Sequence, residues 1–151
     1  MKNSNSINAF GSIYILSNPS LQGIVKIGWT IKGADERAKE LSKSTAIPTP
    51  FEVEEEQPVE WPTEVEAGLH RELRKFRVSP NKEFFRLSPD DASDAIWKYL
   101  YGGTISSEKA LIRCLASWER LMIKYPKRWK FQPNILEALS EIVKASKHDG
   151  F

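Results

Sequence analysis

Two short runs of β-forming residues near the start of the chain constrain the fold most strongly. The first is Ser12-Ile13-Tyr14-Ile15-Leu16 and the second is Ile24-Val25-Lys26-Ile27-Gly28. Between them lies Ser-Asn-Pro-Ser-Leu-Gln-Gly, which is rich in turn-forming residues. Two such runs with a turn between them predict a β-hairpin. Everything that follows in the chain has to pack against this hairpin.

The next part of the chain alternates between helical and extended patterns. Ala34, Ala38 and Leu41 recur at helical spacing, so residues 34–43 are predicted to form a helix. Residues 51–54 alternate between apolar and acidic residues, which predicts a strand with one solvated face, and the acidic run 54–56 is read as its solvated edge.

A second helix is expected from Pro62, because proline favours the first turn of a helix. Glu66 and His70 are four residues apart and therefore lie side by side on this helix. Residues 82–87 are predicted to form a strand, and the Ser88-x-x-Asp91 pattern predicts the start of a further helix that ends near residue 101.

A break at Gly102-Gly103-Thr104 divides the chain. We expect residues 1–10 to be a flexible lead-in and residues 11–101 to be one α+β domain. Residues 104–151 are expected to be a basic C-terminal extension, folded as a helical hairpin with helices over 106–125 and 133–147.

The composition excludes several classes of protein. Of the 151 residues, 40% are hydrophobic and 28% are charged, which is typical of a globular chain. No apolar run is long enough to cross a membrane, and the first residues lack the apolar core of a signal peptide. The single cysteine, Cys114, cannot form an internal disulfide. We therefore expect a cytoplasmic protein, of a bacterium or of a phage-infected host cell.

Positive charge gathers in the last third of the chain. Residues 101–151 hold 9 Lys and Arg against 5 Asp and Glu. Four of these cations lie within seven residues, and they could hold a nucleic-acid backbone. An equally good reading is a solvated loop between two helices. The four are Lys124, Lys127, Arg128 and Lys130.

The hairpin carries a pair of motifs that resembles a known family. Ser12-Ile13-Tyr14 followed by Lys26-Ile27-Gly28 resembles the paired signature of the GIY-YIG nuclease superfamily, in the branch of phages and mobile elements whose second motif reads KIG. Further pieces follow in the family's order: Arg37, then Glu66 with His70, then the Glu83-Phe84-Phe85 strand. The resemblance spans roughly residues 11–87.

The resemblance implies a small antiparallel sheet of about three strands flanked by helices, and cleavage of DNA that depends on Mg²⁺ or Mn²⁺. It implies that Tyr14 is the base or the water-positioning group, and that Lys26 and the metal ion lower its pKa. Arg37 would bind the scissile phosphate, because its planar guanidinium matches phosphate oxygens. Glu66 would be the protein ligand of the metal ion.

Four further residues have less defined roles in this scheme. His70 would order the phosphate or the nucleophile. Glu83 or Asn81 would occupy the late position near the metal ion, where the wider superfamily often has asparagine. Lys26 stands where the wider superfamily has its second tyrosine.

Each of these residues also has a plain structural explanation. Lys26 could protect the edge of a sheet, and Arg37 and Glu66 could form a partly exposed ion pair. The sequence therefore favours an endonuclease and leaves an alternative, a non-catalytic module on the same fold that binds nucleic acid or a partner protein. An endonuclease with one site per chain would cut both strands most simply as a homodimer.

Overall fold

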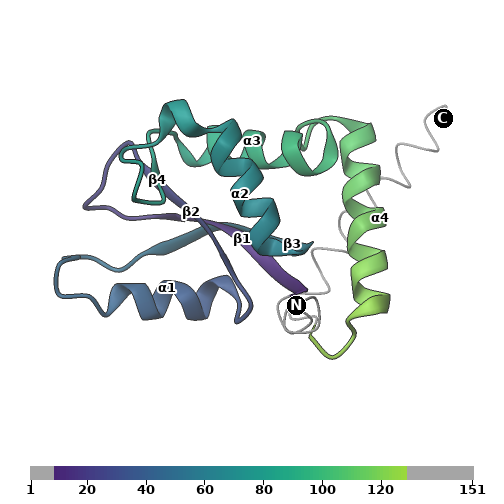
Figure 1. The fold of residues 1–151 in the computed structure, drawn as a ribbon, viewed down its shortest axis with the longest axis horizontal. Coiled ribbons are helices and arrows are strands. Elements are labelled where there is room, and N and C mark those ends of the chain that lie inside the picture. The colour runs from purple at the N-terminus through teal and green to yellow at the C-terminus, as the bar shows by residue number, and fades with distance from the viewer. Residues whose placement is uncertain (1–8, 129–151) are drawn as a thin grey trace. The chain divides into compact units, whose positions relative to one another are not determined.

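The computed structural model describes residues 9–128 of the chain (Figure 1). It divides into two compact units, Met1–Ser93 and Asp94–Phe151. The boundary falls inside helix α3 (Pro89–Tyr101), a few residues before the break expected at Gly102. The fold class is α+β, as the sequence predicted.

The first unit is built on a four-stranded antiparallel sheet, one strand more than the family resemblance implied, and each strand overlaps one predicted from the sequence pattern. Its order is β3-β1-β2-β4, and the predicted hairpin is its centre: β1 (Phe10–Ser17) pairs with β2 (Val25–Thr30). β1 begins at Phe10, inside the stretch expected to be a flexible lead-in. On the other side β1 pairs with β3 (Glu52–Glu60).

Two strands differ from the sequence prediction in length. β3 continues to Glu60 and includes the acidic run, because its whole length pairs with β1. β4 is shorter than expected, only Phe84–Phe85, and it pairs with Val25 and Lys26 alone. The second half of β2 therefore has no strand on that side within the described part of the chain.

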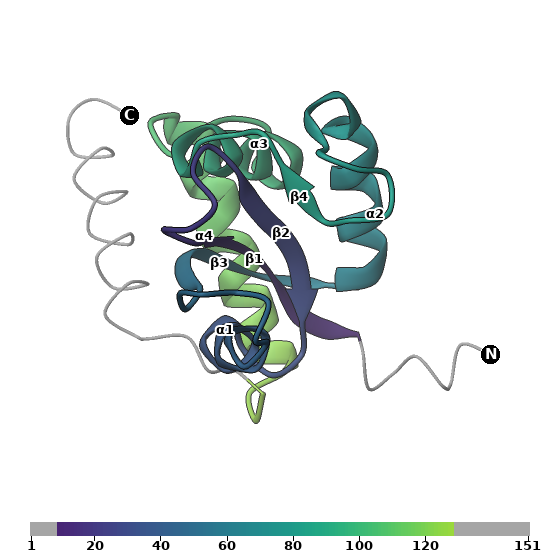
Figure 2. The same cartoon turned by 90° about the vertical axis from the view of Figure 1, so that its left-hand side faces the viewer.

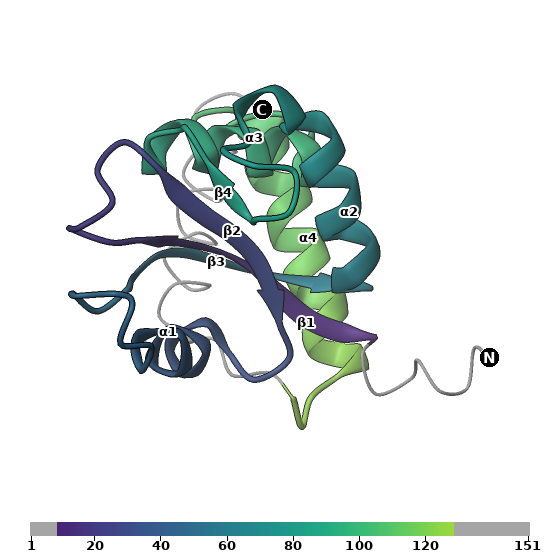
Figure 3. The same cartoon turned by 60° about the vertical axis from the view of Figure 1, so that its left-hand side comes forward.

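Helices α1 (Ala34–Ser42) and α2 (Pro62–Glu72) lie on opposite faces of the sheet (Figures 2 and 3). Tyr14 and Leu16 pack with Ala34 and Ala38 of α1. Side chains alternate along a strand, so Ile13 and Ile15 point to the face that α2 covers. A short 3₁₀ turn, η2 (Arg74–Phe76), follows α2.

The acidic run is part of the fold rather than only a solvated edge. The Glu56 carboxylate accepts a hydrogen bond of 2.6 Å from the Ser12 hydroxyl and one of 3.0 Å from the backbone N–H of Ala34. Ala34 is the first residue of α1, so Glu56 satisfies an otherwise unpaired donor and its charge suits the positive end of the helix. The start of α1 is thereby tied to two strands of the sheet.

The second unit has its own apolar cluster. Helix α4 (Glu108–Lys124) begins after Ser107, whose hydroxyl accepts a hydrogen bond from the Ala110 N–H. Within the cluster, Trp118 Nε1 donates to the Tyr101 hydroxyl at 3.2 Å. Its buried members are Trp97, Tyr101, Ala110, Leu111, Cys114 and Trp118.

The second helix of the expected hairpin, residues 133–147, lies outside the described residues. Among residues 9–128, no helix is long and apolar enough to span a membrane.

Candidate active site

An open cleft of about 270 Å³ in the first unit brings together four of the residues that the sequence singled out for catalysis or metal binding. Its walls come from β1, β2, the loop before α1, α1 itself, α2 and the residue before β4. It opens beside the half of β2 that β4 leaves unpaired. The lining residues are Tyr14, Trp29, Thr30, Ile31, Lys32, Arg37, Glu40, Glu66 and Glu83.

Tyr14 reaches the cleft across the neighbouring strand. It lies opposite Gly28 in the β1–β2 register, and a Cβ atom at Gly28 would lie 2.7 Å from Cζ of the Tyr14 ring. Only a glycine lets the ring lie flat over β2 at this point. The position of the Tyr14 ring thus explains why the Lys26-Ile27-Gly28 motif ends in glycine.

Arg37 meets Tyr14 from α1. Its side chain forms a hydrogen bond with the Tyr14 hydroxyl, in which the guanidinium N–H donates. Burial nevertheless raises the pKa of Tyr14 to about 12, and the negative charges of Glu83 and Glu66 act in the same direction. Lys26 is not among the groups that shift the pKa of Tyr14, so the expectation that Lys26 and a metal ion lower it stays a prediction.

Lys26 has a different partner. Its Nζ lies 2.7 Å from the Glu83 carboxylate and 5.6 Å from the centre of the Phe84 ring, and it does not line the cleft. Since β4 pairs with β2 at this residue, Lys26 does not protect a sheet edge. Its ammonium group holds Glu83 in the cleft wall.

Glu66 is the least satisfied group of the site. It lies on α2, and its Oε2 atom is buried without a hydrogen-bond partner among the described residues. Burial, followed by the nearby charge of Glu83, raises the pKa of Glu66 to about 7, against a partial opposing effect of Lys26 and Arg77. A buried carboxylate oxygen without a donor, beside a second carboxylate, suits a bound cation.

His70 and Asn81 are not brought into the cleft. His70 is buried, and its Nε2 lies 3.0 Å from the Ile27 carbonyl oxygen, so it ties α2 to β2. Its ring also packs against Phe85, with 5.0 Å between ring centres, and burial lowers its pKa. Asn81 is exposed in a turn, so Glu83 is the residue of the late pair that reaches the site.

Two charged residues of the cleft were not anticipated. Lys32 and Glu40 form an ion pair with 3.3 Å between Nζ and Oε2. Glu40 lies three residues after Arg37 on one helix, a spacing that places both on one face and could have revealed it. The predicted pair between Arg37 and Glu66 is not among the ion pairs of the described residues.

The predicted nucleic-acid-binding cations belong to the second unit. Lys124 is the last residue of α4, its Nζ lying 5.6 Å from the centre of the Tyr125 ring. Lys127 and Arg128 follow it, and Lys130 lies outside the described residues. Their part in binding stays a prediction.

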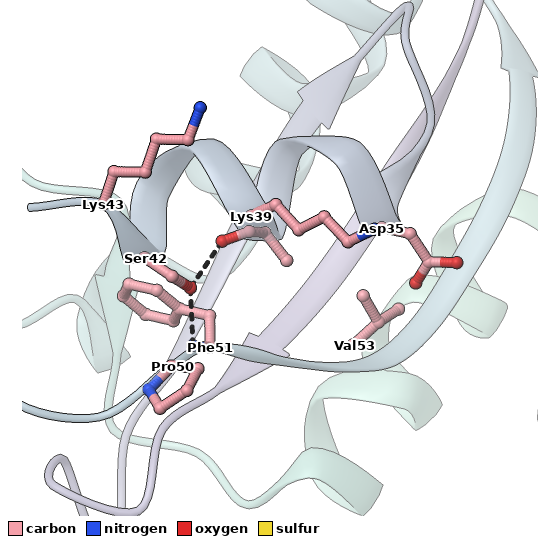
Figure 4. Close-up of a pocket in the computed structure, with 8 residues that line it drawn as sticks. Asp35, Lys39, Ser42, Lys43, Pro50, Phe51 and Val53 are labelled. Atoms are coloured by element: carbon pink, nitrogen blue, oxygen red, sulfur yellow. Dashed lines mark hydrogen bonds between the residues drawn. The ribbon is translucent and has the colours of Figure 1, made fainter.

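A second hollow, of about 510 Å³, lies against α1 and is not lined by Arg37 (Figure 4). Ser42 closes its floor, because its hydroxyl donates to the Ala38 carbonyl at 2.6 Å and accepts from the Phe51 N–H at 2.9 Å. The Lys39 side chain extends along the helix toward Asp35, and Lys43 points away from the hollow (Figure 4). Its one half-buried polar side chain, that of Ser42, is satisfied within the fold, and its charged side chains, those of Asp35, Lys39 and Lys43, are exposed.

Comparison with known proteins identifies one domain. No curated protein and no solved structure matches the chain. The family model of the T5orf172 domain matches residues 11–99, which include β2 to β4, all of β1 except Phe10, and every lining residue of the cleft. Because this match covers more than half of the 151 residues, the chain belongs to the T5orf172 domain family.

Proposed function

We propose that this protein is a metal-dependent endonuclease of the GIY-YIG type, which hydrolyses DNA phosphodiester bonds in the cleft lined by Tyr14, Arg37 and Glu66. The observation that carries the proposal is their meeting in one cleft although they come from β1, α1 and α2. The T5orf172 domain is found in endonuclease-like proteins of phages and mobile elements, which agrees with it.

The cation would be Mg²⁺ or Mn²⁺, held by Glu66 with Glu83 beside it. Residues 9–128 contain no group of three or more His, Cys, Asp or Glu placed to hold a metal ion. This suits Mg²⁺, which keeps several waters and often takes only one or two carboxylates. Such a cation supplies charge stabilisation at the phosphate and a more acidic water.

Arg37 would bind the scissile phosphate. It has five N–H donors in a planar fork, and its bond to Tyr14 uses only part of them. The remaining donors could hold a phosphate oxygen and stabilise the charge that develops as water attacks phosphorus. Arg37 would thus have two roles, binding the substrate and orienting Tyr14.

Tyr14 would act as a neutral hydroxyl. A phenol whose pKa is about 12 is not a free base near neutral pH. Its oxygen accepts from Arg37, so its own proton is available to position the attacking water or a phosphate oxygen. Glu83, held by Lys26, would keep the negative charge next to Glu66 that favours cation binding.

The test is a cleavage assay on supercoiled plasmid with Mg²⁺, Mn²⁺ or EDTA, with Glu66→Gln run in parallel. We expect nicking or linearisation that requires the metal ion and is lost in the variant. No cleavage by folded protein with either metal would overturn the proposal. Linear product that accumulates with protein concentration would further support a homodimer on DNA.

The alternative is a non-catalytic module that binds nucleic acid or a partner protein on the same fold. Two observations favour it: burial keeps Tyr14 protonated, and Lys26 is engaged by Glu83 instead of assisting Tyr14. This alternative predicts DNA binding that weakens steeply with salt, without product in any metal. With either function, a DNA substrate suits the cytoplasmic location expected from the sequence.

A further inference from the structure

We propose that Lys32 is a second phosphate subsite at the mouth of the cleft, and that Glu40 is its counter-ion only until nucleic acid binds. The proposal rests on the proposed function to the extent that the ligand is a nucleic-acid backbone. It assigns opposite roles to the two members of one ion pair, so it can be tested by binding alone.

Lys32 is placed where an approaching ligand can reach it. It lies in the loop between β2 and α1, where its backbone N–H donates to the Thr30 hydroxyl at 3.0 Å. Its side chain is 54% exposed, and among the residues that the structure describes its Nζ pairs with Glu40 at 3.3 Å. The backbone is therefore anchored while the ammonium group faces solvent at the cleft.

Glu40 is incompletely satisfied by this pairing. Its Oε2 atom contacts Lys32, whereas its Oε1 atom is buried with no hydrogen-bond partner among the described residues. A partly exposed ion pair contributes little to stability, so exchanging Glu40 for another anion costs little. An unpaired buried oxygen carries a desolvation penalty, which is relieved when the carboxylate turns toward solvent.

The chemistry of the cleft indicates which anion replaces Glu40. Lys32 and Arg37 are cations of one cleft, and Arg37 is bound to the buried Tyr14 hydroxyl whereas Lys32 lies at the rim. An anion with regularly repeated charges can meet both, one phosphate at Arg37 and a neighbouring phosphate at Lys32. Glu40 lies on the same face of α1 as Arg37. Its negative charge repels the phosphate backbone until its carboxylate leaves Lys32.

The experiment measures binding of a short labelled DNA duplex by fluorescence anisotropy in EDTA and low salt. All proteins carry Glu66→Gln, so no cleavage interferes. Four further variants are compared: Lys32→Gln, Glu40→Gln, their combination, and Glu36→Gln. Glu36 is an exposed acid on the same helix that does not line the cleft, so its substitution removes the same charge.

We expect Glu40→Gln to tighten Kd about fivefold, or about 1 kcal/mol, and Lys32→Gln to weaken it by a similar factor. In the Lys32→Gln background the gain from Glu40→Gln should disappear, because the effect of Glu40 acts through Lys32. Glu36→Gln should change Kd less than twofold. Unfolding temperatures of all variants establish that they are folded.

Three results would overturn the proposal. The first is an equal gain from Glu40→Gln with and without Lys32. The second is DNA binding that Mg²⁺ strengthens when Glu40 is present but not in the Glu40→Gln variant, which would make Glu40 part of a cation site. The third is no DNA binding by any variant. Absence of plasmid cleavage by the wild-type chain would instead overturn the endonuclease and leave the subsite standing.

Discussion

The two sides of helix α1 differ in how far the fold satisfies the half-buried polar groups that line them. At the hollow shown in Figure 4, the Ser42 hydroxyl donates one hydrogen bond and accepts another, and these bonds join α1 to the start of β3. On the cleft side, Glu40 and Glu66 each keep a buried oxygen without a partner, and burial shifts the pKa values of Tyr14 and Glu66.

This contrast separates structural from chemical roles in the two hollows that α1 borders, although Glu66 of the cleft belongs to α2 and Tyr14 to β1. Polar groups that exist to hold a fold are normally paired within it, because a buried unpaired oxygen is costly. Groups that must meet a ligand leave part of their hydrogen-bonding capacity unused in the free chain. Shifted pKa values gather at functional sites for the same reason. The cleft is therefore the side of α1 on which substitutions should affect activity.

The largest expected effect is on cleavage. Arg37→Ala should lower the rate at least about 100-fold, since a donor to developing negative charge is removed. Ser42→Ala, on the other side of the same helix, should leave the rate within about twofold. Rates are measured on supercoiled plasmid with Mg²⁺. Comparable losses in both variants would remove the distinction between the two sides.

Gly28→Ala should damage both the fold and the cleft. The new Cβ atom would lie 2.7 Å from Cζ of Tyr14, so the ring must move, at a cost of about 1–3 kcal/mol in the free energy of unfolding. Gly23→Ala is the matched control, because no atom lies within 4 Å of its Cβ and only its φ of +79° is unfavourable. Urea unfolding gives the stabilities. Cleavage should fall in the first variant only, and a fully active Gly28→Ala chain would contradict the role given to Tyr14.

Ser42→Ala should change stability without changing activity. The substitution removes the bond to the Ala38 carbonyl and leaves the Phe51 N–H without its partner, which costs about 1–2 kcal/mol. Thermal or urea unfolding measures this loss. A variant as stable as the wild type would show that this hollow is no better satisfied than the cleft.

The smallest effect concerns pH and the metal ion. The folded-state pKa of Glu66, about 7, lies above its unfolded value of 4.5, so the folded chain holds this proton more tightly. The resulting stability is complete below about pH 4.5 and is lost as the pH rises through 7. In EDTA at pH 8, Glu66→Gln should therefore unfold a few degrees above the wild type.

Added Mg²⁺ should reverse that order, because it binds the folded wild type and stabilises it. Unfolding temperatures at pH 5 and pH 8, with Mg²⁺ and with EDTA, provide the comparison. If Glu66→Gln and the wild type show the same pH dependence, the raised pKa of Glu66 has no part in the stability of the chain.

The sequence predicted the parts of the site that depend on local pattern. Alternation predicted the hairpin, and the motif order pointed to Tyr14, Arg37, Glu66 and Glu83, which the fold brings to one cleft. The sequence did not predict the pairing between distant segments. β3 extends to Glu60 only because β1 lies beside it.

The same limit explains why two of the predicted site residues, Lys26 and His70, do not line the cleft. His70 resembles a catalytic residue in spacing, but its ring nitrogen contacts the carbonyl of Ile27, a residue 43 positions away. Lys26 forms an ion pair with Glu83, which directly precedes β4 and lies 57 positions further along the chain. Its charge is therefore used there rather than at Tyr14. Such partners depend on tertiary packing, which local patterns do not encode.

The most direct test of the account is Mn²⁺ binding, measured by electron paramagnetic resonance on the wild type, Glu66→Gln and Asp35→Asn. Asp35 lines the hollow on the other side of α1, so its substitution removes an acid without touching the cleft. The account predicts one Mn²⁺ per chain in the wild type and in Asp35→Asn, and its loss in Glu66→Gln. Undiminished Mn²⁺ binding in Glu66→Gln would contradict the assignment of the cleft as the metal site.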